Sequence, residues 1–339
     1  MPEQLPIPPE AGPDLLYDAL VVGAGPTGLL AAVYLARFRR SVCVVDAGAS
    51  RAATIARSHN YPGFADGITG AALVAGLREQ AQRYRIDFAV GCVQRLVRAD
   101  EGSFEACWGE GAGGAAQRVR GRTPKPDSVT GRERAAQRVR GRTVLLATGA
   151  SDIAPRMPYA ADALRDGALR YCPVCDGYEV IGQSVGVLAD GPAGVAEALY
   201  LRQFSERITV FAAHESVVWT RAQRQNLRRA GVTLAEGPVH SIRLWSGCVT
   251  LRHGTAQSPC DVLYSALGMR VHSQLATDLG AAADKDGYLR CDRHQQTTVP
   301  GLWAAGDVAQ GLNQISVGAG GAATAASAMH RALLGRVVC

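Results

Sequence analysis

The strongest constraint on the fold is a pattern that occurs twice in this chain of 339 residues: an apolar strand, a glycine-rich turn and a helix. The first copy is "DALVVGAGPTGLLAAVYLARF" (18–38) and the second is "SVGVLADGPAGVAEALYLRQF" (184–204). Each has the order expected of a nucleotide-binding α/β unit. The chain is also long for one hydrophobic core. We therefore predict an α/β fold with two Rossmann-like, three-layer domains.

The first turn has the full G-x-G-x-x-G spacing, at Gly23, Gly25 and Gly28. Glycines let the backbone approach a pyrophosphate, which the N–H groups at the start of the helix can bind. Asp46, at the end of the next predicted strand, is spaced to bind ribose hydroxyls. Near the other end of the chain, Gly306 and Asp307 offer a carboxylate that suits the sugar-alcohol chain of FAD. We expect a dinucleotide at this turn, and FAD rather than NAD.

The second turn is less complete. Ala189 stands where the first glycine is expected, while Gly191 and Gly194 keep the later positions. The segment after the next strand, "AAHESVVW" (212–219), contains no arginine pair for a 2′-phosphate. Binding of NADP(H) or NAD(H) at Gly191 and Gly194 is therefore a hypothesis that this motif leaves open.

One close pair of cysteines stands out from seven isolated ones. Cys172 and Cys175 lie in "YCPVCDGYE" (171–179). A structural zinc site needs four ligands, and the sequence has no second close pair, so we expect no metal site. The spacing suits a redox-active disulfide, and a helix beginning at the second cysteine would favour its thiolate. Asp176, next to the pair, can move a proton as the disulfide opens and closes.

The net charge of +6 belongs to one segment. Residues 115–142 carry nine Lys or Arg and two acids, and "AAQRVRGRT" occurs there at 115–123 and again at 135–143. We interpret 115–142 as a duplicated basic surface loop and expect no nucleic-acid partner. The proline-rich residues 1–14 are predicted to be disordered and do not form a signal peptide. The apolar run 19–36 is broken by glycines, so we expect a cytoplasmic protein without a membrane span.

Several motifs occur in an order that resembles low-molecular-weight thioredoxin reductases and their relatives: "GAGPTG", "NYPGF", "LLATG", "YCPVCDG" and "GLWAAGDV…NQISVGAGGAA". The resemblance covers about 17–335, apart from the duplication. It implies an FAD-binding domain formed by 15–150 and 285–339. A central NAD(P)-binding-like domain, 155–280, would be inserted in it and carry the dithiol. Such enzymes are usually homodimers.

The resemblance also implies roles for individual residues. Cys175 would face the flavin, Cys172 would exchange with the substrate, and Asp176 would be the acid. Further FAD-binding positions would be Asn60, Gly149, Gln314 and Ile315.

The function implied is that of an FAD-dependent disulfide oxidoreductase of thioredoxin-reductase type. Electrons would pass from NAD(P)H through FAD to the Cys172–Cys175 disulfide, and on to a thioredoxin-like protein or a small-molecule disulfide. The departures at the second turn keep other possibilities open. Relatives of this architecture include dithiol:oxygen oxidoreductases and reductases fed by ferredoxin or another flavin. A flavin-binding redox sensor, with the basic loop as docking surface, is a further alternative.

Overall fold

The computed structural model describes residues 15–109, 137–245 and 247–335. The predicted disordered segment 1–14 lies outside these residues, as does most of the predicted basic loop. The end of that loop, 137–142, is described, and it forms the first part of strand β6 (Gln137–Leu146). The surface loop was therefore predicted to run too far, because the alternating pattern of "QRVRGRTVLL" continues an existing strand.

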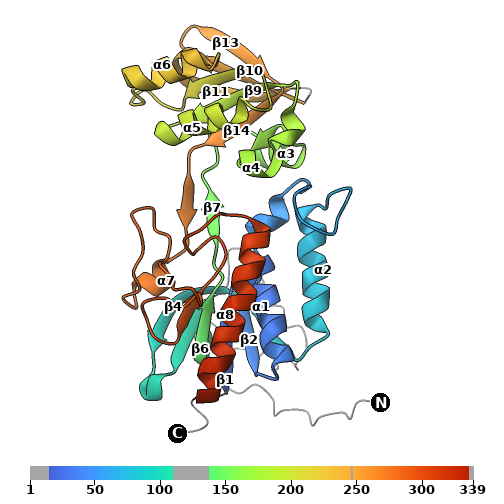
Figure 1. The fold of residues 1–339 in the computed structure, drawn as a ribbon, viewed down its shortest axis with the longest axis vertical. Coiled ribbons are helices and arrows are strands. Elements are labelled where there is room, and N and C mark those ends of the chain that lie inside the picture. Colours follow the sequence, from blue (N-terminus) through green and yellow to red (C-terminus); the bar gives the residue numbers. More distant parts are fainter. Residues whose placement is uncertain (1–14, 110–136, 246, 336–339) are drawn as a thin grey trace, which may run out of the picture. The chain divides into compact units, whose positions relative to one another are not determined.

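The described residues belong to two compact units (Figure 1). The first comprises Met1–Ser50, Val74–Gly149 and Val271–Cys339, as far as these are described. The second comprises Arg51–Leu73 and Ala150–Arg270. The prediction of two Rossmann-like α/β domains, one inserted in the other, is confirmed. This division differs from the expected bounds at two segments, since Arg51–Leu73 belongs to the dithiol-carrying unit and the residues from Val271 onward to the other.

The sheet of the first unit has seven strands in the order β3-β2-β1-β6-β5-β4, with β16 also paired to β6. β1, β2, β3, β6 and β16 run parallel, whereas β5 pairs antiparallel with β6 and with β4. β5 pairs with the first half of β6 and β16 with the second. Besides β6, the strands of this sheet are β1 (Leu16–Val22), β2 (Val42–Asp46), β3 (Ile86–Val90), β4 (Cys92–Arg98), β5 (Phe104–Gly109) and β16 (Leu302–Ala304).

Alternate residues of β1 enter two different cores. Ala19 and Val21 pack with the helices α1 (Pro26–Arg37) and α8 (Ile315–Gly335) on one face, and Leu20 and Val22 pack with β4, β5 and the segment after α7 (Gln274–Thr277) on the other. Figure 1 shows α1 and α8 side by side, and contacts between them are extensive. The first unit also contains the short 3₁₀ turn η2 (Asp100–Gly102) and most of α2 (Gly70–Gln82), within which the unit boundary falls. The 3₁₀ turn η1 (Arg51–Thr54) belongs to the second unit.

The sheet of the second unit has seven strands in the order β13-β12-β11-β10-β9-β14-β8. The five from β11 to β8 run parallel, and β12 and β13 extend the sheet as an antiparallel hairpin. β9, the strand of the second glycine turn, is the middle one of these five parallel strands. The strands are β8 (Leu169–Arg170), β9 (Ser184–Ala189), β10 (Arg207–Ala212), β11 (Thr233–Trp245), β12 (Cys248–His253), β13 (Ala256–Cys260) and β14 (Val262–Ala266).

Helices cover one face of this sheet, where α5 (Pro192–Leu201) and α6 (Arg221–Arg229) pack on β9 and β10. The opposite face packs against α3 (Ala160–Arg165) and against the β12–β13 hairpin, which folds back so that β12 contacts β14 and β13 contacts β9. The short α4 (Pro173–Asp176) and η3 (Tyr178–Val180) stand between β8 and β9 in the chain. Two further strands, β7 (Ala150–Asp152) and β15 (Met269–Val271), pair with each other where the chain passes between the units. None of the helices in the described residues has the length and apolar character needed to cross a bilayer.

Candidate functional site

The first glycine turn needs its glycines for steric reasons. Gly23 has φ of +102°, and a Cβ built on it would lie 2.4 Å from the carbonyl oxygen of Ala147. A Cβ on Gly28 would lie 1.9 Å from the carbonyl oxygen of Gly23. Gly25 is different, because a Cβ there would meet only Ser50 Oγ, at 3.4 Å. Gly23 and Gly28 therefore let the turn close against the sheet, and Gly25 leaves space at the start of α1.

Asp46 holds this turn from the end of β2. Its Oδ1 accepts a hydrogen bond from the backbone N–H of Ala24 at 2.9 Å, and its Oδ2 accepts one from the N–H of Gly48 at 3.1 Å. Arg78 of α2 lies 3.4 Å from Oδ2. Arg78 carries no sequence signal, because a lone arginine on an amphipathic helix is usually a solvated residue.

Residues from both ends of the chain meet at the carboxyl edge of the first sheet. The N–H of Ala147 donates to the carbonyl of Val22, and that of Ala305 donates to the carbonyl of Leu146. Gly306 packs against Thr27 of α1, where a Cβ would lie 2.6 Å from Thr27 Oγ1. This edge therefore carries the remaining predicted FAD residues of the first unit: Gly149 with φ of +66°, Asp307 after β16, and Gln314 and Ile315 at the start of α8.

These residues fit a dinucleotide. The turn at Gly23–Gly25 is open on the side of Gly25, and α1 begins there without a side-chain cap among the described residues. The N–H groups of its first turn can therefore bind an anion. Asp46 is fixed beside the turn by the N–H of Ala24, at the strand end where a ribose is bound in this fold.

Asn60, the other predicted FAD residue, belongs to the second unit. Its Oδ1 accepts a hydrogen bond from Ser58 Oγ at 3.0 Å.

The second glycine turn keeps its packing function. A Cβ on Gly194 would lie 2.1 Å from the Cβ of Ala189, so only glycine lets α5 approach β9 this closely. Gly191 caps α5 in extended backbone, with open space around its Cα. The alanine at the first position is accommodated because Ala189, the last residue of β9, lacks the positive φ that Gly23 adopts in the first turn.

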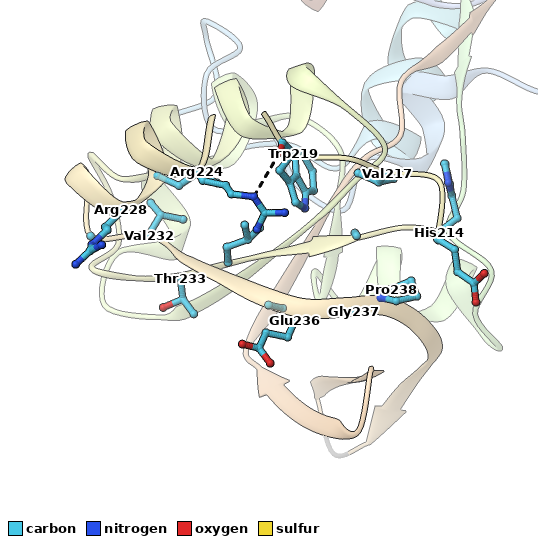
Figure 2. A pocket seen from close by; sticks show the side chains of 16 residues that line it. His214, Val217, Trp219, Arg224, Arg228, Val232, Thr233, Glu236, Gly237 and Pro238 are labelled. Carbon is cyan, nitrogen blue, oxygen red and sulfur yellow. Dashed lines mark hydrogen bonds between the residues drawn. The ribbon is translucent and has the colours of Figure 1, made fainter. Parts of the chain in front are cut away.

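Beyond β10, a pocket of about 750 Å³ lies between α6, the segment before it and β11 (Figure 2). Trp219, Leu227 and Val232 form its apolar part. The Nε atom of Arg224 donates to the carbonyl oxygen of Trp219 at 3.3 Å, and the Arg224 side chain lies beside that ring in Figure 2. The charged groups that line the pocket are those of Glu215, Arg224, Arg228 and Glu236.

Helix α5 also carries a buried carboxyl group. Burial, with a smaller contribution from the charge of Asp152, raises the pKa of Glu197 to about 7. Its Oε2 is buried and lacks a hydrogen-bond partner among the described residues.

The predicted dithiol is a disulfide in the second unit. The Sγ atoms of Cys172 and Cys175 are bonded, and the two Cα atoms are 5.3 Å apart. Cys172, not Cys175, stands at the start of the single-turn helix α4: its Sγ accepts the N–H of Cys175 at 3.1 Å. A helix beginning at the second cysteine was the condition under which the Cys175 thiolate would be favoured, and the structure does not meet it, since α4 begins at Pro173 with Cys172 before it. Pro173 explains the difference, since its fixed φ suits the first position of a helix.

Asp176 ends α4 and lies among polar partners. Tyr264 donates its hydroxyl to Oδ1 of Asp176 at 2.7 Å, and Arg170 Nη1 lies 3.6 Å from Oδ2. Burial raises the pKa of Asp176 to about 6, although Arg170 and Tyr264 oppose that shift. A carboxyl group with this pKa can both donate and accept a proton near neutral pH. Arg170 and Tyr264 carry no sequence signal, because neither residue is part of a recognisable motif.

The glycine after Asp176 is also required by packing. A Cβ on Gly177 would lie 2.6 Å from the carbonyl oxygen of Pro173 and 2.8 Å from the ring of Phe204. The motif C-x-x-C-D-G thus ends in a residue that lets α4 pack against the segment after α5.

Two nucleotide-binding-type folds, one with a complete glycine cradle and the other with a disulfide followed at once by a carboxyl group of raised pKa, define an oxidoreductase that acts on disulfides. The chain belongs to the pyridine nucleotide-disulphide oxidoreductase family, whose model matches residues 17–332.

Individual relatives agree with this assignment. The chain is 26% identical over 330 residues to thioredoxin reductase of Listeria innocua, covering 91% of this chain and 92% of the relative. It is 28% identical over 330 residues to thioredoxin reductase of Treponema pallidum, covering 92% and 95%. Its structure is similar to the crystal structure of HlmI, with a TM-score of 0.80 and 30% identity over 95% of this chain and 94% of that one. The protein is a flavin-dependent disulfide oxidoreductase that resembles thioredoxin reductase, and its cofactor is FAD.

Proposed function

We propose that the protein passes electrons from NAD(P)H through FAD to the Cys172–Cys175 disulfide, and then to a disulfide of a thioredoxin-like protein or of a small molecule. The observation that carries this proposal is the disulfide itself, held in a one-turn helix that ends at Asp176. FAD, when bound, supplies a carrier that takes up two electrons and can reduce a disulfide.

The chain's own residues bind and orient this carrier. Gly23, Gly25 and Gly28, with the N–H groups of α1, hold the pyrophosphate, and Asp46 binds the adjoining ribose. Asp307 binds the sugar-alcohol chain. The N-terminus of α8, at Gln314 and Ile315, stabilises negative charge on the ring system. Gly149, Gly306 and Asn60 are the remaining residues that we assign to FAD.

At the dithiol, the thiolate of Cys172 attacks a sulfur of the substrate disulfide. The substrate S–S bond breaks, and the departing thiolate takes a proton from the carboxyl group of Asp176. The thiolate of Cys175 then attacks Cys172 Sγ, which releases the second substrate sulfur as a thiolate that is protonated by solvent. The enzyme dithiol loses two electrons and becomes the disulfide, and the substrate disulfide gains those two electrons.

The nicotinamide coenzyme is assigned to the second glycine turn, at Gly191 and Gly194. Arg224 and Arg228, at the pocket beyond β10, are the basic residues there that can bind the 2′-phosphate of NADPH. If they do, replacing both by alanine raises the KM for NADPH and leaves that for NADH unchanged. An equal effect on both coenzymes, or none, contradicts this role.

Anaerobic reduction of the flavin tests the electron donor. Stopped-flow mixing with NADPH, NADH or reduced ferredoxin is followed by the loss of flavin absorbance. We expect bleaching by a nicotinamide coenzyme. If neither NADPH nor NADH bleaches the flavin, a nicotinamide coenzyme is not the electron donor. If reduced ferredoxin alone bleaches it, ferredoxin is the donor instead.

A dithiol:oxygen oxidoreductase is the second candidate, favoured by Ala189 at the first position of the coenzyme turn and by a segment 212–219 without arginine. The same groups would then act in reverse: a substrate dithiol loses two electrons to Cys172–Cys175, and oxygen takes them from the flavin as hydrogen peroxide. Peroxide formed on adding a small dithiol in air supports this candidate. Anaerobic bleaching by the dithiol without peroxide in air removes it.

We further propose a homodimer in the cytoplasm that works with a thioredoxin-like partner. Thioredoxin reductases of similar length are the chain's relatives. Cys43, Cys92, Cys107, Cys248, Cys260 and Cys291 are free thiols, which suits a reducing compartment. Light scattering of the purified protein tests the dimer, and a monomer at micromolar concentration contradicts it.

A further inference from the structure

Two residues of neighbouring strands converge on Asp176. Arg170 of β8 and Tyr264 of β14 are Cα partners in the parallel pairing of these strands. Residues paired in this way project from the same face of the sheet. α4 lies over that face, and both side chains reach its last residue. The contact is therefore built into the register of the sheet.

Tyr264 is a permanent hydrogen-bond donor to the carboxyl group. Its side chain is fully buried, and its hydroxyl lies 2.7 Å from Asp176 Oδ1 and 3.2 Å from the backbone carbonyl oxygen of Asp176. Burial, followed by the charge of Asp176, raises the pKa of Tyr264 far above its usual range. The phenol consequently stays protonated wherever the protein is folded. Both of its acceptors are oxygen atoms of Asp176, and Arg170 also hydrogen-bonds to the phenol oxygen.

Arg170 fixes the backbone below the carboxyl. Its Nε donates to the carbonyl oxygen of Gly167 at 3.1 Å and its Nη1 donates to that of Asp176 at 2.9 Å. The same Nη1 is 3.6 Å from Oδ2, beyond a hydrogen bond but close enough for charge attraction. Oδ1 is thus occupied by the phenol, while Oδ2 lies beside a positive charge.

The remaining charged groups near Asp176 oppose this effect. Glu179 of η3 raises the pKa of Asp176, as does burial, and Glu179 is itself paired with His59 at 2.8 Å. Arg170, Tyr264 and Glu179 are the groups whose charge or hydrogen bonding acts on the carboxyl. The first two favour the carboxylate and the third favours the carboxylic acid.

We propose that Tyr264 and Arg170 are positioning residues for the dithiol reaction, which hold the Asp176 carboxyl so that Oδ2 is the oxygen that exchanges the proton. This inference rests on the role proposed above for Asp176. In the forward step, Oδ2 gives its proton to the departing substrate thiolate and leaves a carboxylate whose Oδ1 retains the phenol hydrogen bond. The next proton comes from solvent, so no further reactant is required.

The test is the pH dependence of two reactions of the holoenzyme between pH 5 and 9. In the first, dithiothreitol reduces the flavin through the disulfide under anaerobic conditions, with the rate corrected for the fraction of dithiothreitol thiolate. In the second, iodoacetamide alkylates the reduced dithiol, measured by mass spectrometry, which needs no flavin turnover. Wild type should show an inflection near pH 6 in both profiles, set by the pKa of Asp176. Asp176→Asn should abolish that inflection.

Tyr264→Phe retains the buried ring and removes only the hydroxyl. Loss of a hydrogen bond to a carboxylate should move the inflection upward by roughly 1–2 pH units. Arg170→Gln should move it upward as well, and Arg170→Lys should restore part of the difference. Tyr200→Phe, at an exposed position of α5, is the matched control and should leave the inflection where it is. A Tyr264→Phe variant that loses rate equally at every pH has only a structural defect and overturns the proposal.

The outcomes separate this inference from the proposed function. If wild type is not bleached by dithiothreitol, the proposed electron path fails, while the alkylation profiles still decide the role of Tyr264. If wild type is bleached and Asp176→Asn removes the inflection, but Tyr264→Phe leaves it unmoved in both reactions, the inference alone fails.

Discussion

Gly28 lies directly against Gly23, and a Cβ added to Gly28 would stand 1.9 Å from the Gly23 carbonyl oxygen. The contact is between a helix and the turn that precedes it, so neither side is a flexible side chain. The glycine turn therefore has two functions: it lets α1 pack tightly against the end of β1, and it lets a pyrophosphate approach the backbone.

Replacing Gly28 by alanine should consequently both destabilise the first unit and remove FAD. We expect a loss of about 3 kcal/mol or more, because the clash is with backbone, and a decrease in Tm of roughly 6–12 °C. Differential scanning fluorimetry and the flavin absorbance of the purified protein measure the two effects. Gly76→Ala is the matched control: Gly76 lies in α2, with open space around its Cα, and alanine there should stabilise the helix by about 0.5–1 kcal/mol. Similar behaviour of both variants would contradict this account.

Asp46→Ala should weaken FAD binding without unfolding the protein. The substitution removes the acceptor for the N–H groups of Ala24 and Gly48 and leaves Arg78 without its carboxylate. Hydrogen bonds to a charged group contribute about 1.5–3 kcal/mol, so the Kd for FAD should rise roughly ten- to a hundredfold. Fluorescence titration of the apoprotein with FAD measures it. Glu79→Gln, on the exposed side of α2, should have no effect, and an unchanged Kd for Asp46→Ala would refute the assignment.

Serine at position 172 or 175 should abolish disulfide turnover and leave FAD bound. Each substitution removes one sulfur of the exchanging pair, and the predicted loss of turnover is at least about a hundredfold. The FAD residues of the first unit are untouched, so the flavin spectrum should persist. Cys92→Ser replaces an exposed free thiol of β4 and should retain full turnover. Full turnover by either variant would contradict the proposal that Cys172 and Cys175 carry out the disulfide exchange.

Glu197→Gln should flatten the dependence of stability on pH. The folded-state pKa of Glu197 is about 7, above its usual 4.5, so the folded protein holds this proton more tightly than the unfolded chain. The stabilisation is fully present below pH 4.5 and is lost as the pH rises through 7, by at most about 3 kcal/mol.

Urea unfolding of the second unit at pH 5 and pH 8 tests this dependence. Wild type should lose more stability between the two pH values than Glu197→Gln, and the contribution of Asp176, which has the same sign, cancels in that comparison. Glu206→Gln, an exposed control in the same unit, should behave like wild type. Equal losses in wild type and Glu197→Gln would show that this carboxyl does not titrate on folding.

Much of the fold could be predicted from local patterns. The alternation of apolar residues, the glycine turns at Gly23 and Gly191 and the uncharged end of β6, residues 143–146, each indicate their own element, because they depend on neighbours in the chain. The dithiol and Asp46 were found for the same reason, since their spacing is a motif.

The residues that were missed depend on strand register. Tyr264 has the pattern of a buried strand residue, and only the pairing of β14 with β8 places its hydroxyl on Asp176 beside Arg170. Arg78 similarly reaches Asp46 from a helix that is distant in sequence. A single sequence contains no signal for such contacts, since the partners are 32 to 88 residues apart.

The position of β16 and α8 has a consequence for synthesis of the protein. β16 pairs with β6 in the sheet that contains β1, and Gly306 and Gly318 both pack against Thr27 of α1. A ribosome that has extruded the chain as far as Arg270 has released every residue of the second unit but not the last strand and helix of the first. The dithiol unit can therefore fold during translation. The FAD-binding turn at Gly23 becomes complete only after β16 and α8 have been synthesised.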